Sequence, residues 1–116
     1  MGKQKKTTPQ SYQIRLTHNT LKNIDEITGY IAFIKNSPLN AIKVADTIFE
    51  TIDRINLHPF AFRECEELPT KSKIYRRAIC LSWLIIYKIS LKEIIILGVI
   101  HTSKKPTSIK SLRNIN

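Results

Sequence analysis

The 116-residue sequence predicts an α+β fold with the element order β-α-α-β-β-β, in which a helical hairpin packs on an antiparallel sheet. Two observations predict this fold. In the first half of the chain, apolar residues recur at three- and four-residue spacing, which is the period of amphipathic helices. In the second half, apolar runs are separated by two-residue breaks, which is typical of strands joined by tight turns. A chain of this length supports one domain.

A short strand and a capped helix are predicted first. Residues 12–16 alternate apolar and polar side chains, as a half-buried strand does. Thr17 then offers a side chain that can cap a helix N-terminus, and the helix is expected to end near Asn36. The apolar stripe of this helix consists of Leu21, Ile24, Ile27, Ile31 and Ile34.

A second helix follows directly. Ser37 is expected at its N-cap and Pro38 at the first helical position, where the missing proline N–H has no hydrogen bond to lose. The helix is expected to end before Pro59, because proline disfavours helical backbone at the preceding His58. The apolar stripe consists of Ala41, Ala45, Ile48, Ile52 and Ile55.

Three strands are predicted in the second half of the chain, over residues 74–80, 83–90 and 93–100. The breaks between them leave room only for tight hairpins, so the strands should form an antiparallel meander. A loop over residues 60–73, with a short strand near 62–65, precedes them.

The predicted organisation is a polar leader over residues 1–11, one domain over 12–106 and a basic tail over 107–116. The hairpin and the sheet are expected to share one core. Its predicted members are Ile24, Ile31, Ile48, Ile52, Ile86 and Leu97.

The charge of the chain is unevenly distributed. The formal net charge is +10. Residues 1–67 hold nine Lys and Arg against eight Asp and Glu, whereas residues 68–116 hold ten against Glu93 alone. A half this basic attracts phosphates or an acidic protein.

Membrane, metal and disulfide chemistry are not indicated. The longest apolar run, residues 94–100, is too short to span a bilayer, and no apolar stretch follows the leader as in a secretory signal. We therefore expect a cytoplasmic protein. Cys65 and Cys80 have no neighbouring ligands at metal-site spacing and are expected to be free thiols. No metal and no cofactor is predicted.

Several stretches, taken in order, resemble the RelE/ParE superfamily of toxins. The second helix ends in INLHP at residues 55–59, and YRRAI at 75–79 precedes WLIIYKI at 83–89. The last strand continues as IIILGVIHTSKKP over residues 94–106. The resemblance spans residues 12–106, and the order and spacing of the motifs carry it.

The resemblance implies a toxin of a bacterial type II toxin–antitoxin module. Such a toxin binds a cognate antitoxin in a hetero-oligomer. ParE-like members inhibit DNA gyrase, a topoisomerase, by protein binding, whereas RelE-like members cut mRNA on the ribosome. A degenerate, non-toxic member that binds nucleic acid is a third hypothesis.

The candidate residues differ between these hypotheses. A nuclease would use Arg77 and His101, one to hold charge on the phosphate and the other to move a proton. Partner or target binding is assigned to Arg76, Lys104 and Lys105. The nuclease branch often has an arginine where this chain has Leu84, and no tyrosine follows Tyr87. These departures favour a ParE-like protein that acts by binding, and the RelE-like nuclease is the alternative.

Overall fold

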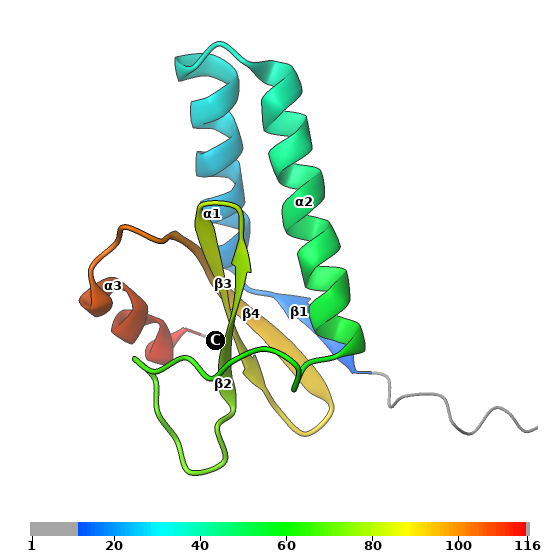
Figure 1. Cartoon of the computed structure of the whole chain (residues 1–116), viewed down its shortest axis with the longest axis vertical. Helices are drawn as coiled ribbons and strands as arrows, with labels where there is room; N and C mark the ends of the chain where they lie inside the picture. The colour runs from blue at the N-terminus through cyan, green and yellow to red at the C-terminus, as the bar shows by residue number, and fades with distance from the viewer. Residues whose placement is uncertain (1–11, 116) are drawn as a thin grey trace, which may run out of the picture.

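The fold is built on a four-stranded sheet, seen in the computed structural model that describes residues 12–115 (Figure 1). The predicted leader, residues 1–11, lies outside the described residues. The elements in chain order are β1 (Gln13–Leu16), α1 (His18–Gly29), η1 (Tyr30–Ile34), α2 (Pro38–Leu57), β2 (Tyr75–Cys80), β3 (Trp83–Ile89), β4 (Glu93–His101), α3 (Pro106–Lys110) and η2 (Ser111–Asn114). The predicted order of the first helices and of the strands is confirmed.

The sheet is mixed, with strand order β1-β4-β3-β2. The antiparallel meander of β2, β3 and β4 is confirmed. Strand β1 pairs with β4 in parallel, so the sheet is not antiparallel throughout. The long helical hairpin explains this, because it carries the chain from β1 at one edge to β2 at the other. The predicted strand near residues 62–65 is reduced to a single bridge between Glu64 and Arg76.

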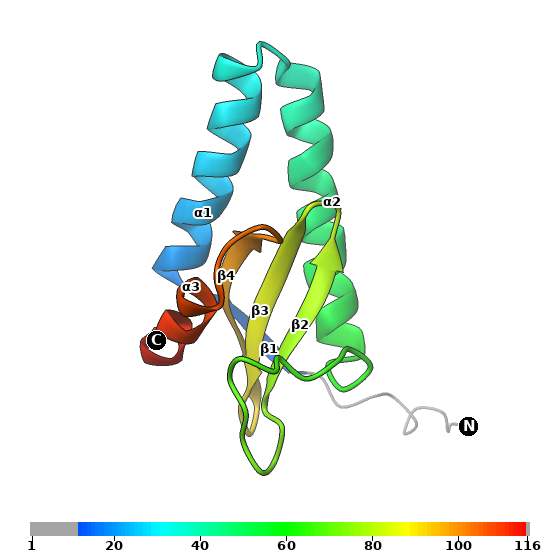
Figure 2. The ribbon, with the colours of Figure 1, turned by 60° about the vertical axis from the view of Figure 1, so that its left-hand side comes forward.

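Local sequence signals set the ends of the helices. The Thr17 side chain caps α1 by accepting a hydrogen bond from Thr20 N at 3.1 Å. Pro38 occupies the first turn of α2, which ends at Leu57 as Pro59 requires. Helix α1 continues into the π-helical turn η1, where Lys35 N donates to Tyr30 O at 3.0 Å. Helices α1 and α2 lie side by side and project beyond the sheet in two views (Figures 1 and 2).

Two apolar clusters lie on opposite faces of the sheet. One cluster packs against the hairpin and includes Ile48 and Tyr87, so we call this side the hairpin face. The other includes Ile86 and Leu97, and we call it the second face. Every core residue predicted from the sequence is buried. The prediction of one core was wrong, because side chains alternate along a strand and therefore fill both faces.

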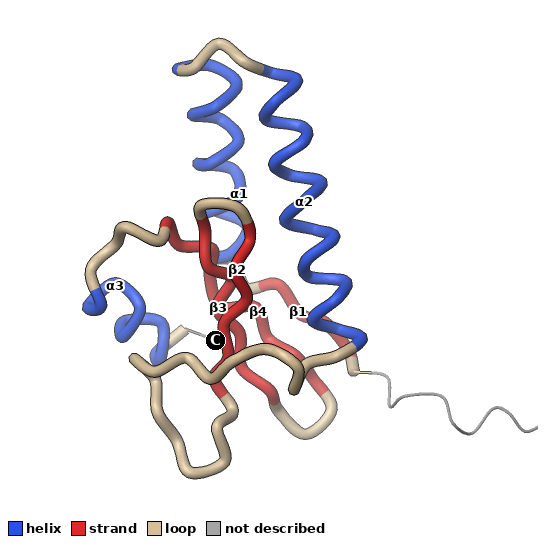
Figure 3. Tube along the Cα trace, in the orientation of Figure 1, coloured by secondary structure: helices blue, strands red, loops and turns tan. Residues whose placement is uncertain are grey.

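The C-terminal segment covers the second face. Residues 107–116 were predicted as a tail, but α3 and η2 bury Ile109 and Leu112 in the second cluster. Arg113 lies over the ring of Tyr75, 5.3 Å from its centroid, and donates to Pro69 O. In the tube view, α3 and α2 lie on opposite sides of the sheet (Figure 3). The segment is therefore part of the folded domain.

Helix α1 is fastened to β4 by polar side chains at a β-bulge. The pairing of β3 with β4 shifts register beside Ile86, so that β4 carries one extra residue next to Gly98. Asn19 Nδ2 donates to Leu97 O at 2.9 Å, and Val99 N donates to Asn23 Oδ1 at 3.0 Å. A Cβ atom on Gly98 would lie 3.1 Å from both asparagine side chains, so the close approach requires glycine.

Replacing a buried apolar residue on either face by aspartate should strongly destabilise the fold. Ile48→Asp and Leu97→Asp each place an unpaired carboxylate in a fully packed cluster, which we expect to lower the free energy of unfolding by more than about 4 kcal/mol. Denaturant titration measures the loss. Leu91→Asp is the control, because Leu91 is 86% exposed. Unchanged unfolding of both core variants would contradict the two-cluster assignment.

The two described glycines should respond to alanine in opposite directions. Gly98→Ala crowds Asn19 and Asn23 and should cost about 1–3 kcal/mol of stability. Gly29→Ala meets no atom within 4 Å at the end of α1 and should stabilise by up to about 1 kcal/mol, because alanine favours helix. Thermal unfolding of both variants tests this. Equal effects would mean that the bulge tolerates a side chain.

Candidate functional site

Arg77 lies on the second face of the sheet. It pairs across the strands with Ile86, and it lies next to Ala78, whose side chain enters the opposite, hairpin-side cluster. Its guanidinium is half-buried, and within residues 12–115 it makes no side-chain hydrogen bond or ion pair. The charge of Arg77 is therefore available to an anion.

His101 lies on the hairpin face. It pairs with Trp83, and the two rings meet edge to face with centroids 5.9 Å apart. The Nδ1 atom accepts a hydrogen bond from Ser103 N at 3.1 Å and lies 2.8 Å from Ser103 Oγ. An Nδ1 that accepts from a backbone N–H carries no proton, so the neutral ring has its proton on Nε2. The imidazole thus closes the turn that follows β4.

The bulge at Gly98 separates the two candidate catalytic residues. Ile95 and Leu97 point to the second face, and strict alternation would place His101 there too. The extra residue reverses the alternation, so Val99 packs in the hairpin-side cluster and His101 follows it. The sheet therefore lies between His101 and Arg77.

Arg76 is held by the loop that precedes β2. Its guanidinium donates to Phe60 O, Phe62 O and Lys73 O at 3.2, 2.8 and 2.9 Å, and it lies over the Phe60 ring. These contacts fix residues 60–62 against the strand. The Nε and Nη1 donors of Arg76 are thus used within the fold, where they position this loop.

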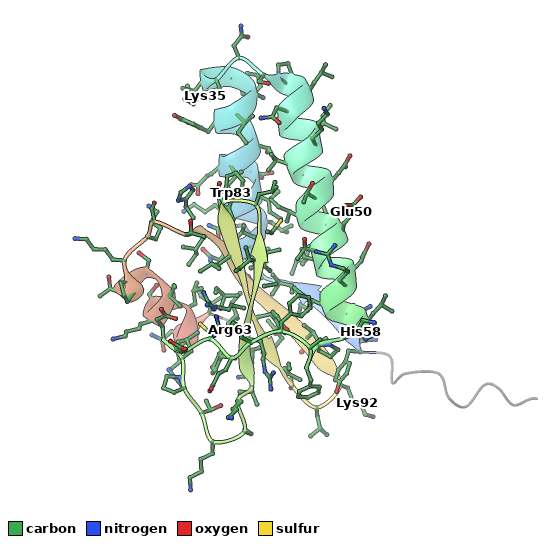
Figure 4. The ribbon with its side chains drawn as sticks, viewed as in Figure 1. Lys35, Glu50, His58, Arg63, Trp83 and Lys92 are labelled. Carbon is green, nitrogen blue, oxygen red and sulfur yellow. The ribbon has the colours of Figure 1, made fainter. Side chains whose placement is uncertain are left out.

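A large cleft opens where the hairpin projects past the sheet. Its volume is about 1180 Å³, and its walls come from α1, η1, the start of α2, the β2–β3 turn, the end of β4 and α3. Two of its lining residues, Lys35 near the tip of the hairpin and Trp83 at the start of β3, are labelled in Figure 4. We call it the hairpin cleft. Its apolar lining comprises Ile27, Tyr30, Ile31, Val44, Leu81, Trp83, Val99, Ile100 and Leu112.

Polar and charged groups form the rest of the hairpin cleft. Lys35, Lys104 and His101 contribute to its lining, and Glu26 is the acidic residue among them. Its amide and hydroxyl groups belong to Asn19, Asn23, Asn40, Ser82, Ser108 and Ser111. Lys105, the other lysine predicted to bind a partner, is exposed at the N-terminus of α3.

Sequence reasoning missed most of the hairpin cleft. Tyr30 and Leu81 are 52% and 56% exposed. Tyr30 is outside the predicted apolar stripe and Leu81 was assigned to a tight turn, so neither was expected to line a site. Leu81 has a φ of 56°, which bulky residues rarely adopt, at the turn between β2 and β3. An apolar residue in a two-residue hairpin turn is the signal that could have pointed here.

Two buried groups lack the chemistry of a base or nucleophile. Burial, followed by the Glu67 carboxylate, raises the pKa of Cys65 to about 11, so the thiol stays protonated at neutral pH. Burial also raises the pKa of Tyr87, whose hydroxyl donates to Pro59 O at 2.6 Å. Both groups serve the fold.

Residues 12–115 show neither a membrane-spanning helix nor a metal-binding cluster. No helix in this part of the chain combines the length and apolarity that a membrane crossing requires. The same residues contain no group of three His, Cys, Asp or Glu side chains that could hold a metal ion.

Comparisons of the sequence and of the fold with known proteins agree with each other. Residues 14–106 match the family described as the ParE toxin of the type II toxin-antitoxin system, parDE. The fold resembles a chain of the chromosomal ParDE toxin–antitoxin system from P. aeruginosa, with 18% identity, a TM-score of 0.62, and coverage of 79% of this chain and 97% of that one.

It also resembles a chain of the RelBE2 toxin–antitoxin complex from Mycobacterium tuberculosis, with 16% identity, a TM-score of 0.52, and coverage of 78% and 98%. No curated protein matches the sequence. Because the family match spans most of the residues and the fold agrees with it, this chain belongs to the ParE toxin family of type II toxin–antitoxin systems.

Proposed function

We propose that the chain is a cytoplasmic toxin that inhibits a topoisomerase, DNA gyrase, by binding it, and that an antitoxin neutralises the toxin in a hetero-oligomer. Membership of the ParE family supports the toxin assignment. One observation favours binding over catalysis: Arg77 and His101 lie on opposite faces of the sheet.

Metal-free RNA cleavage needs a base, a cation and an acid around one phosphate. On the second face, Arg77 supplies a cation, but the nearby Cys65 thiol is protonated and Tyr75 is buried. Leu84, in the place of a nuclease arginine, is buried in the second cluster. Among these residues, Arg77 is therefore the one that we assign to the phosphate charge.

The RelE-like alternative has one observation in its favour. The Arg77 guanidinium is half-buried and unpaired within the described residues, so it could meet a phosphate. A nuclease would then have to obtain its proton-transfer groups from the ribosome or from the RNA itself. This hypothesis requires the Arg77 guanidinium for cleavage.

Lys104 and Lys105 are the residues we assign to target binding. Both are exposed, and they lie in the basic half of the chain. Truncation after Ile100 would test them poorly, because it also removes Ile109 and Leu112 from the second cluster. Charge reversal at the two lysines keeps the fold and changes only the surface.

The chain alone should inhibit DNA supercoiling by gyrase and should leave mRNA on translating ribosomes uncut. Lys104→Glu with Lys105→Glu should weaken the inhibition about tenfold, since charge complementarity steers association. Lys92→Glu, also exposed, is the matched control. Arg77→Ala and His101→Gln should change inhibition less than about twofold.

Ribosome assays provide the contrary outcome. Specific mRNA cuts by the wild-type chain, reduced about a hundredfold or more in Arg77→Ala, would establish the nuclease and overturn our proposal. A further loss of about 10²–10⁴-fold in His101→Gln would assign proton transfer to the imidazole.

A further inference from the structure

Helices α1 and α2 leave an apolar groove open on the side of the hairpin away from the hairpin cleft. Figures 1 and 2 show the two helices side by side. The groove has a volume of about 650 Å³, and we call it the outer groove. Leu21, Phe33, Ile42 and Phe49 contribute large side chains to its lining, and Gly29 and Ala45 contribute small ones. It therefore runs from the sheet end of the hairpin, where Thr20 is bonded to β4, towards the tip at η1.

The large side chains of the outer groove are exposed in the single chain. Phe33 is 82% exposed and Ile42 is 58% exposed, and Leu21 and Phe49 are exposed as well. The lining residues recur at three- and four-residue spacing along each helix, so they form one continuous surface. A contiguous exposed apolar surface marks an interaction site.

The charge of the hairpin selects a second copy of this chain as the occupant. Residues 18–57 hold four Lys and Arg against five Asp and Glu, although the whole chain carries +10. Asp25 is the charged residue in the lining of the outer groove, which disfavours an acidic partner. Two copies of the chain repel each other through their basic halves, whereas their hairpins are nearly neutral. Contact between hairpins therefore avoids the repulsion.

The same charges determine how two hairpins would be oriented. In a parallel pair, the strands β2 to β4 of both copies, which belong to the basic half, would lie next to each other. In an antiparallel pair, the tip of each hairpin lies beside the sheet end of the other, and the basic halves lie at opposite ends. Phe33 of each copy then meets Leu21 and Phe49 of the other across a two-fold axis.

The size of the outer groove predicts a reversible dimer. The twelve residues from Leu21 to Phe33 extend over about 18 Å of helix. Two helices packed about 10 Å apart present a surface about 20 Å wide. The contact would bury roughly 500 Å² of each copy, which is near the lower limit for a biological interface. We therefore expect dimers in exchange with single chains.

We propose that the outer groove is a self-association surface, through which two copies of this chain form an antiparallel, two-fold dimer of hairpins. The dimer would be a layer of four helices with one sheet at each end. Lys104, Lys105 and Arg77 do not line the outer groove and stay outside the contact. This inference goes beyond the proposed function, because it concerns the chain by itself and does not depend on the target.

Sedimentation equilibrium of the full chain over a range of concentrations tests the proposal. The wild type should dimerise with a dissociation constant of about 10–100 µM, as expected for a small interface. Phe33→Ala and Ile42→Asn should each weaken the dimer about tenfold or more. The matched controls are Tyr30→Ala, at the hairpin cleft, and Leu91→Asn, in the β3–β4 turn, and each should change the dissociation constant less than about threefold.

Gly29→Gln fills the outer groove without removing a contact of the fold. A Cβ atom on Gly29 meets no atom within 4 Å, so a longer side chain has room in the single chain. In the dimer, this side chain would occupy space that the second copy fills, and the dimer should weaken about tenfold or more. The melting temperature of the dilute variant should equal or exceed that of the wild type, because glutamine favours helix. A lowered melting temperature would identify misfolding instead.

Two further measurements test the nature and the orientation of the contact. Raising the salt concentration from about 0.05 to about 0.5 M should leave the dimer as strong or stronger, because salt screens the repulsion between two chains of charge +10. A spin label at Lys35→Cys, near the hairpin tip, should lie more than about 20 Å from the label of the other copy. Both native cysteines are buried.

Three results would refute the proposal: a wild-type chain that is monomeric at every concentration, a dimer weakened as much by Tyr30→Ala as by Phe33→Ala, or labels in contact at the tips. A monomeric wild type whose binding to the co-encoded antitoxin is weakened by Phe33→Ala would assign the outer groove to the antitoxin. The proposed function fails separately, since a chain that dimerises as described but does not inhibit gyrase would refute only the target.

Discussion

The attachment of α1 to the backbone of β4 determines the arrangement of the whole molecule. Thr17 and Thr20 donate their hydroxyl groups to Ile96 O at 2.8 and 2.7 Å, and the amides of Asn19 and Asn23 bond the backbone on either side of Gly98. An apolar contact could slide, whereas these directional bonds fix the position of α1 along the strand. The hairpin is therefore fixed in position along β4. The part of the hairpin that extends beyond the sheet forms a wall of the hairpin cleft.

Most of the fold could be predicted because it depends on local sequence signals. Thr17, Pro38 and Pro59 act through their own backbone neighbours, so the helix boundaries could be read without knowing any tertiary contact. The pairing of β1 with β4 and the burial of α3 depend on residues far apart in the chain. Ile109 and Leu112 form an apolar pair too short to stand out in a polar segment.

The candidate site, too, could be predicted only in part from the sequence. The opposite faces of Arg76 and Arg77 follow from strand geometry, and Arg77 is where alternation predicts. The position of His101 could not be predicted, because a bulge interrupts the alternation, and the side chains that bond the bulge come from α1, far away in the sequence. The hairpin cleft could not be predicted either. Periodicity indicates which residues share a helix face, but not where the opposing sheet ends.

The bulge in β4 has a consequence for how this fold could change its chemistry over time. Removing one residue there would restore strict alternation and carry the imidazole through the sheet to the side of the guanidinium. A single-codon deletion would thus bring a proton-transfer group and an anion-binding group onto one surface. In this architecture, the length of one strand determines which side chains share a face of the sheet.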